Sequence, residues 1–204
     1  MRESLLRALQ YRHACKVFDE SREVSDEDMR FILEAGRLSP SSFGLEQWRF
    51  IVARSGTLKQ QLMAACFNQQ QLITCSVVVS IAAKVQELTP GSDYVNKMFE
   101  RRNYPPDTYQ WIVQFYQSYY KQIDVLPWSI MQCHIAAANM MTAAAFIGID
   151  SCPIGGFEPQ KVRDVLQIDP GKEDIALIIP LGYRKGPQPP IYRLSFDEIV
   201  QYIG

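Results

Sequence analysis

The chain has 204 residues, 47% hydrophobic and 21% charged, with a formal net charge of -1 at pH 7. This length suits one globular domain with a sizeable core, and the balanced charge disfavours nucleic acid or an anionic membrane as a partner. The cysteines (Cys15, Cys66, Cys75, Cys133 and Cys152) lack zinc-ligand spacing, so we expect reduced thiols, no metal site and a cytoplasmic protein.

Helical patterns occur at the start of the chain and recur along it. Residues 1–11 have an amphipathic pattern with two arginines and a glutamate, unlike a secretory signal. Ser25 and Asp28 are typical of a capped helix start, and the apolar spacing carries that helix to about Leu38, where Pro40 stops it. Further helices are predicted near residues 57–66, 107–122, 128–147 and 159–166.

The longest apolar run extends from Trp128 to Ile149. Polar residues interrupt it, including Gln132, His134 and Asn139. We therefore expect a helix buried in the core or between subunits, and no membrane span. We also expect His134 to be a structural histidine of that helix, because a neutral imidazole can satisfy one partner and pack like an aromatic ring.

Three segments predict strands, at residues 48–53, 76–82 and 174–182, because they are rich in β-branched, aromatic and other apolar residues. Their apolarity is continuous rather than alternating, which indicates helices on both faces of the sheet. The class is therefore mixed α and β.

Two segments lie outside this pattern. Residues 87–106 are polar, contain three prolines and lack a clean period, so we expect an excursion or flexible lid. After Gly186 the chain is proline-rich, and Ser195 to Glu198 predict a capping box with a short closing helix. We expect a single domain, residues 1–204, with an excursion near 87–127 and a C-terminal arm at about 186–204.

Common signatures are absent: there is no G-x-G-x-x-G after a strand, no Walker A sequence and no H-E-x-x-H. A Rossmann or P-loop protein is therefore disfavoured. The two histidines, His13 and His134, do not accompany a nucleophile-elbow sequence, which disfavours a hydrolase triad.

Five separated motifs remain: Arg12-His-Ala-Cys-Lys-Val-Phe18, the loop Ser39 to Phe50 (SPSSFGLEQWRF), Asn68-Gln-Gln-Gln71, Pro153-Ile-Gly-Gly156 and Arg193. Each is weak alone. In this order they resemble the FMN-dependent nitroreductase family, especially its oxygen-insensitive NAD(P)H nitroreductases, over nearly the whole chain. The resemblance implies an α+β, three-layer fold, in which helices flank a central, mostly antiparallel sheet, and an intertwined homodimer.

The resemblance implies that the first and last motifs bind FMN. Arg12 and Arg193 suit bidentate contact with the phosphate, and His13 and Ala14 belong to the same cofactor-binding segment. Lys16 matches the family lysine whose charge stabilises reduced flavin. Taken alone, Arg12, His13 and Lys16 are also compatible with a solvated helix end.

The resemblance also assigns a loop to the cofactor. Pro40, Ser41, Ser42 and Gly44 would wrap the ribityl and phosphate region, often across the dimer interface. A simple turn after a helix explains the same residues equally well. Trp48 and Phe50, at the end of this loop, would anchor it to the core.

Three amide residues and a glycine segment complete the implied site. Asn68 and Gln71, spaced to face one side of a helical turn, would reach the pyrimidine edge of the ring, although capping would also explain them. Gln132 is either a satisfied core amide or a flavin contact. Pro153, Ile154, Gly155 and Gly156 are either a turn or the segment against the flavin, where a backbone N–H at Gly155 approaches N5.

The sequence departs from the family pattern at several of these positions. Ala14 replaces a frequent serine, and Ile191 a lysine, so two contacts to phosphate are lost. Gly44 replaces the usual asparagine of the loop, and Glu46-Gln47 the commoner Gln-Pro. Gly155 lies where many relatives have glutamate. We expect weaker FMN binding and a changed substrate preference or flavin potential.

The implied activity is ping-pong electron transfer from NAD(P)H through FMN to nitroaromatics, quinones or free flavins, without a protein nucleophile. Three alternatives stay open. The same scaffold serves flavin reduction and dehalogenation, a flavin-binding redox sensor would turn over little, and the separate motifs are each compatible with an interaction protein that lacks flavin.

Overall fold

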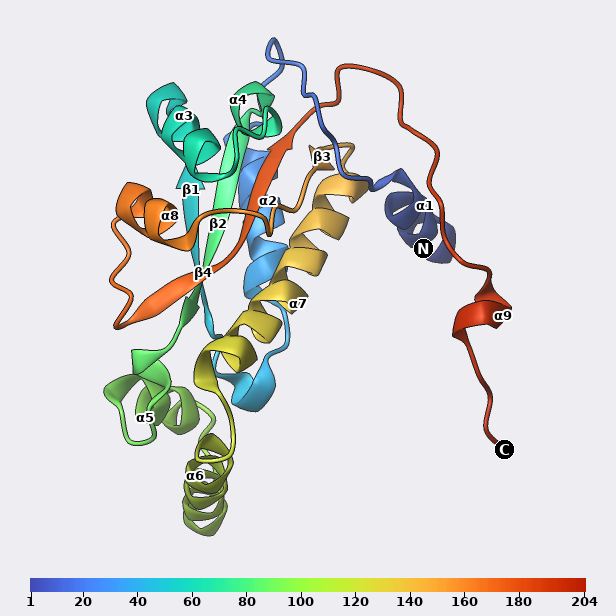
Figure 1. Cartoon of the computed structure of the whole chain (residues 1–204). Helices are drawn as coiled ribbons and strands as arrows, with labels where there is room; N and C mark the ends of the chain where they lie inside the picture. The colour runs from blue at the N-terminus through green and yellow to red at the C-terminus, as the bar shows by residue number, and fades with distance from the viewer.

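The computed structural model describes residues 1–204 (Figure 1). The predicted strands and the helices outside residues 87–106 are confirmed, with ends shifted by three residues or fewer. The elements are α1 (Arg2–Tyr11), α2 (Asp26–Arg37), the 3-10 turn η1 (Ser42–Gly44), β1 (Trp48–Ala53), α3 (Gly56–Ala65), α4 (Gln71–Thr74), β2 (Val77–Lys84), the 3-10 turn η2 (Gln86–Leu88), α5 (Asp93–Glu100), α6 (Pro106–Tyr120), α7 (Val125–Phe146), β3 (Asp150–Ser151), α8 (Pro159–Leu166), β4 (Glu173–Gly182) and α9 (Phe196–Ile199).

The four strands form one antiparallel sheet in the order β1-β2-β4-β3, which confirms the predicted α+β class. β2 lies between two neighbours and is buried along almost its whole length. Its register with β4 shifts between Ile81 and Ala82. β1 pairs with β2 alone, so its other edge is free within the chain.

Helices cover both faces of the sheet, as the continuous apolarity predicts. Successive side chains of a strand point to opposite faces. Val77, Val79 and Ile81 therefore join the core beneath α2 and α7, while Val78 and Ala82 join the core beneath α3, α4 and α8. These two clusters make a three-layer architecture (Figure 1).

Helix α2 begins as the sequence predicts and approaches α7 closely. The Ser25 side chain accepts a hydrogen bond from the Asp28 backbone N–H at 3.0 Å, so an orphan donor of the first turn is satisfied. On its inner face, a Cβ at Gly36 would lie 2.8 Å from the Met140 side chain. Glycine at this position therefore allows the two helices to approach each other.

The excursion is helical, which corrects the expectation of an aperiodic lid. Ser92 caps α5 by accepting from the Val95 N–H at 3.1 Å. Val95, Met98 and Phe99 then bury one face of this short helix against α6 and the start of α7, in a separate apolar cluster. The signal is present as i, i+3, i+4 spacing, but eight helical residues between polar neighbours do not stand out in the sequence.

Helix α1 and the start of the C-terminal arm lie beside each other near the last turns of α7, whereas the C-terminus itself stands away from both (Figure 1). α1 packs on α7, and the predicted capping box of α9 is confirmed, because Ser195 and Glu198 bond reciprocally. α9 has no buried residue and stands away from the sheet. None of the helices combines the length and apolarity that crossing a bilayer requires.

All five cysteines are free and buried, and burial raises the pKa of each thiol. Burial raises the pKa of Cys15 to about 11, and the pKa values of Cys66, Cys75 and Cys133 to about 12, from an ordinary 9.0. Above about pH 9 the unfolded chain therefore binds fewer protons than the folded one. Folding stability is complete below that pH and falls as the pH rises through the raised pKa values.

We predict that the free energy of unfolding, measured by urea denaturation, decreases between pH 8.5 and 11, and that Cys133→Ala makes this decrease shallower. Val79→Ala is the control, since it weakens the same core without removing a titrating group. Equal pH slopes in Cys133→Ala and the parent chain would contradict the prediction.

Candidate functional site

Two arginines from opposite ends of the chain line the same hollow. Arg12 follows the last turn of α1 in an extended conformation, and Arg193 lies in the C-terminal arm. Both line a hollow of about 250 Å³ with His13, Ala14, Met141, Ser151 and Pro153, and both also line a cleft of about 690 Å³ between α1 and the arm.

Neither guanidinium of this pair is neutralised. Arg12 makes no side-chain hydrogen bond or ion pair, and Arg193 only donates to the Tyr192 carbonyl at 2.7 Å. Planar guanidiniums bind phosphate and carboxylate oxygens through two parallel bonds. The hollow is therefore suited to an anion such as a phosphate.

A buried carboxylate fixes the surroundings of this hollow. Asp150 receives the Arg184 guanidinium at 2.8 and 3.0 Å and the Tyr11 hydroxyl at 3.2 Å. Arg184 also lies over the Tyr11 ring at 3.9 Å, and burial, with Asp150 next, raises the pKa of Tyr11. Gln188, in the arm, donates to the Gln10 carbonyl at 2.8 Å. The end of α1 and the start of the arm are thus held together, which places Arg12 beside Arg193.

The sequence-predicted residue His13 points toward that carboxylate. Its Nδ1 lies 3.6 Å from Asp150 and its side chain is 9% exposed. Ala14, by contrast, is exposed and bridges to Ser151. His13 therefore contributes to the hollow mainly by fixing the turn after α1, while Ala14 presents backbone to it.

Lys16 and Gln71 both contact Cys152, which directly precedes the 153–156 segment. The Lys16 ammonium lies 3.6 Å from the Cys152 sulfur and the Gln71 amide nitrogen 3.8 Å from it. Burial raises the pKa of Cys152, and the charge of Lys16 opposes that rise. Gln71 also donates to Gln69, whose amide donates to the Gly156 carbonyl at 3.0 Å. Cys152 links Lys16 to Gln71, and Gln69 links Gln71 to Gly156; neither contact is predicted from the sequence motifs.

The glycine segment presents backbone, not side chains. Ile154 is buried and pairs with Ile178 at the end of the sheet, whereas Pro153, Gly155 and Gly156 are exposed. A Cβ built on Gly155 meets nothing within 4 Å. This backbone therefore leaves open space beside Lys16 and Gln71.

Asn68 lies outside any helix, which corrects its predicted placement on a helical turn with Gln71. It has φ 57°, in the left-handed region that asparagine tolerates, and its side chain is exposed in the turn before α4. Gln71, the first residue of α4, is buried. Asn68 and Gln71 are therefore joined by a turn, and they do not share one face of a helix.

The remaining predicted residues lie near the other end of α7 (Figure 1). Gln132 is 9% exposed, accepts from the Ser42 N–H at 2.9 Å and donates to the Trp128 carbonyl. Both ends of its amide are thus satisfied within the chain. Asn139, one of the polar interruptions of α7, donates to Ser39 at 2.8 Å. These contacts attach the loop of Pro40, Ser41, Ser42 and Gly44 to α7.

The structure therefore divides the predicted site residues into two groups that lie apart from each other. Arg12 and Arg193 line a hollow beside Met141, in the last turns of α7. Lys16, Gln71 and the 153–156 segment gather around Cys152. Ser42 of the loop instead bonds to Gln132, in the first half of α7. Gln132 and Met141 are separated by roughly 14 Å of helix at 1.5 Å per residue. One chain alone does not close both groups around a ligand.

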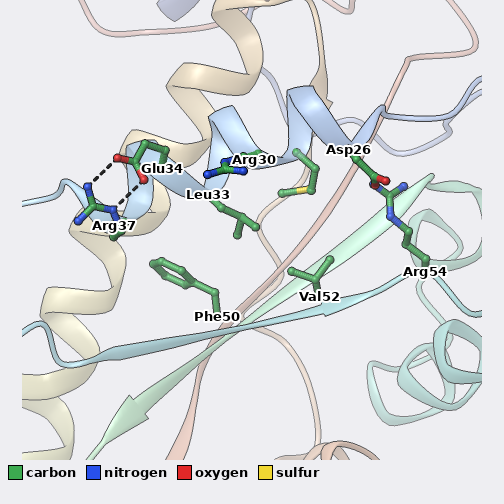
Figure 2. Close-up of a pocket in the computed structure, with 9 residues that line it drawn as sticks. Asp26, Arg30, Leu33, Glu34, Arg37, Phe50, Val52 and Arg54 are labelled. Carbon is green, nitrogen blue, oxygen red and sulfur yellow. Dashed lines mark hydrogen bonds and ion pairs between the residues drawn. The ribbon is translucent and has the colours of Figure 1, made fainter.

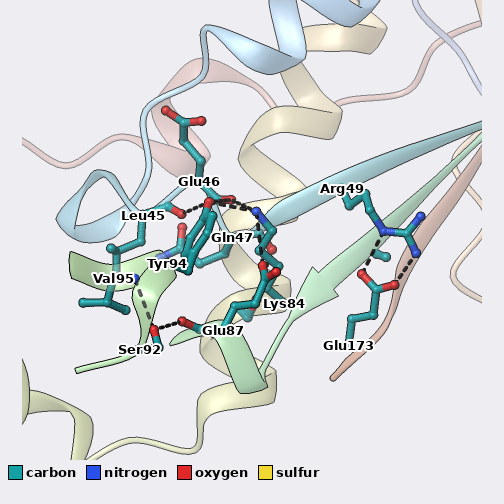
Figure 3. Close-up of polar contacts among 12 residues, drawn as sticks. Leu45, Glu46, Gln47, Arg49, Lys84, Glu87, Ser92, Tyr94, Val95 and Glu173 are labelled. Carbon is teal, nitrogen blue, oxygen red and sulfur yellow. Dashed lines mark hydrogen bonds and ion pairs between the residues drawn. The ribbon is translucent and has the colours of Figure 1, made fainter. Parts of the chain in front are cut away.

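Side chains from the excursion and β2 clasp the 39–47 loop (Figure 3). Phe43, Gly44 and Glu46 all have left-handed φ, between 47° and 59°, which is unfavourable for the two residues that are not glycine. The backbone carbonyls of residues 43–46 all accept hydrogen bonds from side chains of the excursion. They accept from Arg102 (residue 43, 3.2 Å), Arg101 (residue 44, 3.4 Å) and the Tyr94 hydroxyl (residues 45 and 46, 2.8 and 3.1 Å).

Tyr94 itself accepts a hydrogen bond from a partly buried ammonium. Lys84 donates to the Tyr94 hydroxyl at 2.8 Å and lies 3.6 Å from Glu87. Burial lowers the pKa of Lys84 and raises that of Tyr94. The pair fixes the loop to the end of β2, so the excursion is part of the loop's support.

A separate groove of about 580 Å³ lies between α2 and the free edge of β1 (Figure 2). Its floor includes Leu33, Phe50 and Val52, and two ion pairs flank it, Asp26 with Arg54 and Glu34 with Arg37. No residue predicted for the cofactor lines it.

Comparisons with known proteins agree on one family. The nitroreductase family model matches residues 9–183. Two curated proteins named "Putative NAD(P)H nitroreductase", YfkO of Bacillus subtilis and one from Staphylococcus epidermidis, are similar to this chain at 34% and 36% identity, over all of this chain and 99% and 98% of theirs.

Solved structures share the fold. The Bacillus subtilis protein ydfN has a TM-score of 0.87 at 22% identity, with both chains fully covered. A protein of Exiguobacterium sibiricum, solved in complex with FMN, has a TM-score of 0.83 at 22% identity and covers 97% of this chain and 96% of its own.

We predict that Tyr94→Phe lowers the free energy of unfolding by about 1–3 kcal/mol, because a hydroxyl that bonds two loop carbonyls and a partly buried ammonium is lost. Urea denaturation measures the change. Tyr119→Phe is the matched control, since that hydroxyl makes no hydrogen bond within the chain. Equal effects of the two variants would show that the Tyr94 hydroxyl does not hold the loop.

Proposed function

The chain belongs to the nitroreductase family, and on this premise we propose that it is an FMN-dependent oxidoreductase that carries electrons from NAD(P)H to nitroaromatic, quinone or flavin acceptors by a ping-pong mechanism. Curated relatives named for NAD(P)H nitroreduction support the donor, and a neighbour of the same fold solved with FMN supports the cofactor. When bound, FMN would supply the hydride and electron transfer.

The observation that carries this proposal is the pair of unneutralised guanidiniums at one hollow. Arg12 and Arg193 would hold the FMN phosphate there, although Ala14 and Ile191 supply no further polar side chain. The open space at Gly155 fits a planar ring against backbone. The donor set therefore fits a flavin mononucleotide.

The neighbouring side chains would orient the ring and tune its charge. Lys16 is a cation beside the 153–156 segment, held near Cys152, and would stabilise negative charge on the reduced ring. Asn68 and Gln71 supply amide donors and acceptors for the pyrimidine edge. These residues bind and orient; none is a nucleophile.

We propose that the working form is an intertwined homodimer, because one chain separates the two groups of predicted residues. A second copy running in the opposite direction along α7 would bring its 39–47 loop to the Arg12 end of the first. α7 has a surface for this contact: Met131, Ile135 and Phe146 are 58%, 39% and 56% exposed. Apolar residues at this spacing form one stripe of the helix.

The C-terminal arm supports the same assembly. Phe196, Ile199 and Tyr202 are 62%, 67% and 85% exposed, and the arm beyond Arg193 buries none of its residues on its own chain. The groove beside the free edge of β1 offers an apolar floor and the unpaired cation Arg30, which match the apolar and acidic residues of a partner's arm.

We predict that the purified protein saturated with FMN keeps, after desalting, the visible spectrum of oxidised flavin, and that NADH or NADPH bleaches it until a quinone or nitroaromatic restores it. Arg12→Gln should weaken FMN binding by at least about tenfold, the value of a lost charge-assisted hydrogen bond. Arg7→Gln, which removes an exposed charge from α1, is the control.

A colourless desalted protein would overturn the flavin assignment. A bound flavin that NAD(P)H reduces, but that quinone and nitroaromatic reoxidise only slowly, would favour the redox sensor over the enzyme.

We predict that a chain ending at Arg193 elutes as a monomer in gel filtration at concentrations where the full chain elutes as a dimer. Phe196→Ser with Ile199→Ser in the full chain should shift elution in the same direction, while Gln201→Ala should not. A full chain that binds FMN as a monomer would refute the dimer.

A further inference from the structure

Arg102 occupies the space that a side chain at position 44 would fill. A Cβ built on Gly44 would lie 1.6 Å from one Arg102 guanidinium nitrogen and 2.8 Å from its central carbon. Gly44 also has φ 59°. The resembling family usually has asparagine here, so in this chain a guanidinium from the excursion takes that place on the loop.

This guanidinium is fixed by neutral groups only. Arg102 donates to the Phe43 carbonyl at 3.2 Å and to the Tyr104 hydroxyl at 2.9 Å, and no carboxylate pairs with it. Its neighbour Arg101, by contrast, pairs with Glu46 at 2.5 Å. The Arg102 charge is therefore exposed, oriented and unneutralised.

An exposed aromatic surface adjoins this charge at Phe43. We call Phe43, Trp111 and Phe115 the aromatic shelf. The Phe43 and Phe115 rings are 5.8 Å apart, and Phe115 stacks on Trp111 at 5.2 Å with an interplanar angle of 4°. Trp111 is 59% exposed and Phe115 48%. Contiguous exposed apolar surface beside polar groups is typical of a ligand or protein contact site.

We propose that Arg102 is a specificity-determining residue that binds the anionic substituent of a planar aromatic acceptor while the ring of that acceptor packs on the aromatic shelf. The inference rests on the proposed function and its homodimer, in which the 39–47 loop of one copy meets the Arg12 end of the other, and it narrows the substrates to aromatic anions such as nitrobenzoates. The guanidinium fork matches a carboxylate, and the shelf matches a flat ring. The negative charge of the acceptor would thus be recognised by Arg102 beside the 39–47 loop.

The test compares two acceptors of nearly equal shape, 4-nitrobenzoate and neutral 4-nitrobenzamide, with the FMN-loaded protein. The readout is the ratio of their kcat/KM values. Arg102→Gln should lower the benzoate-to-benzamide ratio by about fivefold, the value of a partly exposed ion pair. Lys97→Gln removes one exposed charge from α5 in the same excursion and should keep the parent ratio.

The variant Gly44→Asn distinguishes the position of the Arg102 guanidinium from its charge. Asparagine tolerates the left-handed backbone, but its side chain displaces the guanidinium while the net charge stays the same. The ratio should fall in this variant as in Arg102→Gln. A fall in Arg102→Gln alone would assign the effect to the overall field and overturn the local contact.

A binding measurement without NAD(P)H makes the test independent of turnover. Quenching of tryptophan fluorescence by each acceptor gives two dissociation constants, and Trp111→Phe should remove most of the quenching. The benzoate should bind about fivefold more tightly than the benzamide in the parent chain and equally well in Arg102→Gln. If neither acceptor is reduced while this binding difference holds, the proposed reaction fails and the aromatic-anion site stands.

Two results would overturn the inference. One is equal benzoate-to-benzamide ratios, in both kinetics and binding, for the parent chain and Arg102→Gln. The other is a change confined to the ratio of NADPH to NADH, which would assign the guanidinium to the phosphate of the donor.

Discussion

The packing of α7 across one face of the sheet is the constraint on which the rest of the structure depends. At 1.5 Å per residue, this helix of 22 residues spans roughly 33 Å. It holds the 39–47 loop through Gln132 in its first half and Asn139 in its second half, and it leads to Asp150 beyond its end. The polar interruptions of an apolar helix thus have a use, since they attach a loop of predicted cofactor residues. The same length separates that loop from Arg12 and makes a second chain part of the proposed site.

The 39–47 loop combines local strain with many external contacts. Its left-handed residues Phe43 and Glu46 are unfavourable by themselves, and hydrogen bonds from Tyr94, Arg101 and Arg102 offset that cost. Because those donors come from the excursion, the excursion shapes the loop. A change of sequence there therefore reaches the cofactor side of the protein without touching the family motifs.

Local signals were sufficient where neighbouring residues in the chain supply the interaction. The cap of α2 at Ser25, the capping box at Ser195 and the apolar strands are all predictable, because the capping partners lie within a few residues of each other and the strands are continuous apolar runs. The helix α5 was missed, because its apolar face has meaning only against α6 and α7. Asn68 was misplaced, because a left-handed turn leaves no periodic signal.

The sequence by itself determined the mixed α and β class and, through the order of its motifs, the resemblance to the family, which in turn implied an antiparallel sheet. Only the tertiary structure decided which of those motifs meet. It placed Arg12 beside Arg193 through the buried Asp150, connected Lys16 to Gln71 through Cys152, and set the 39–47 loop apart from them. The physical reason is that a periodic pattern specifies which face of an element is buried, whereas the meeting of distant residues depends on how whole elements pack.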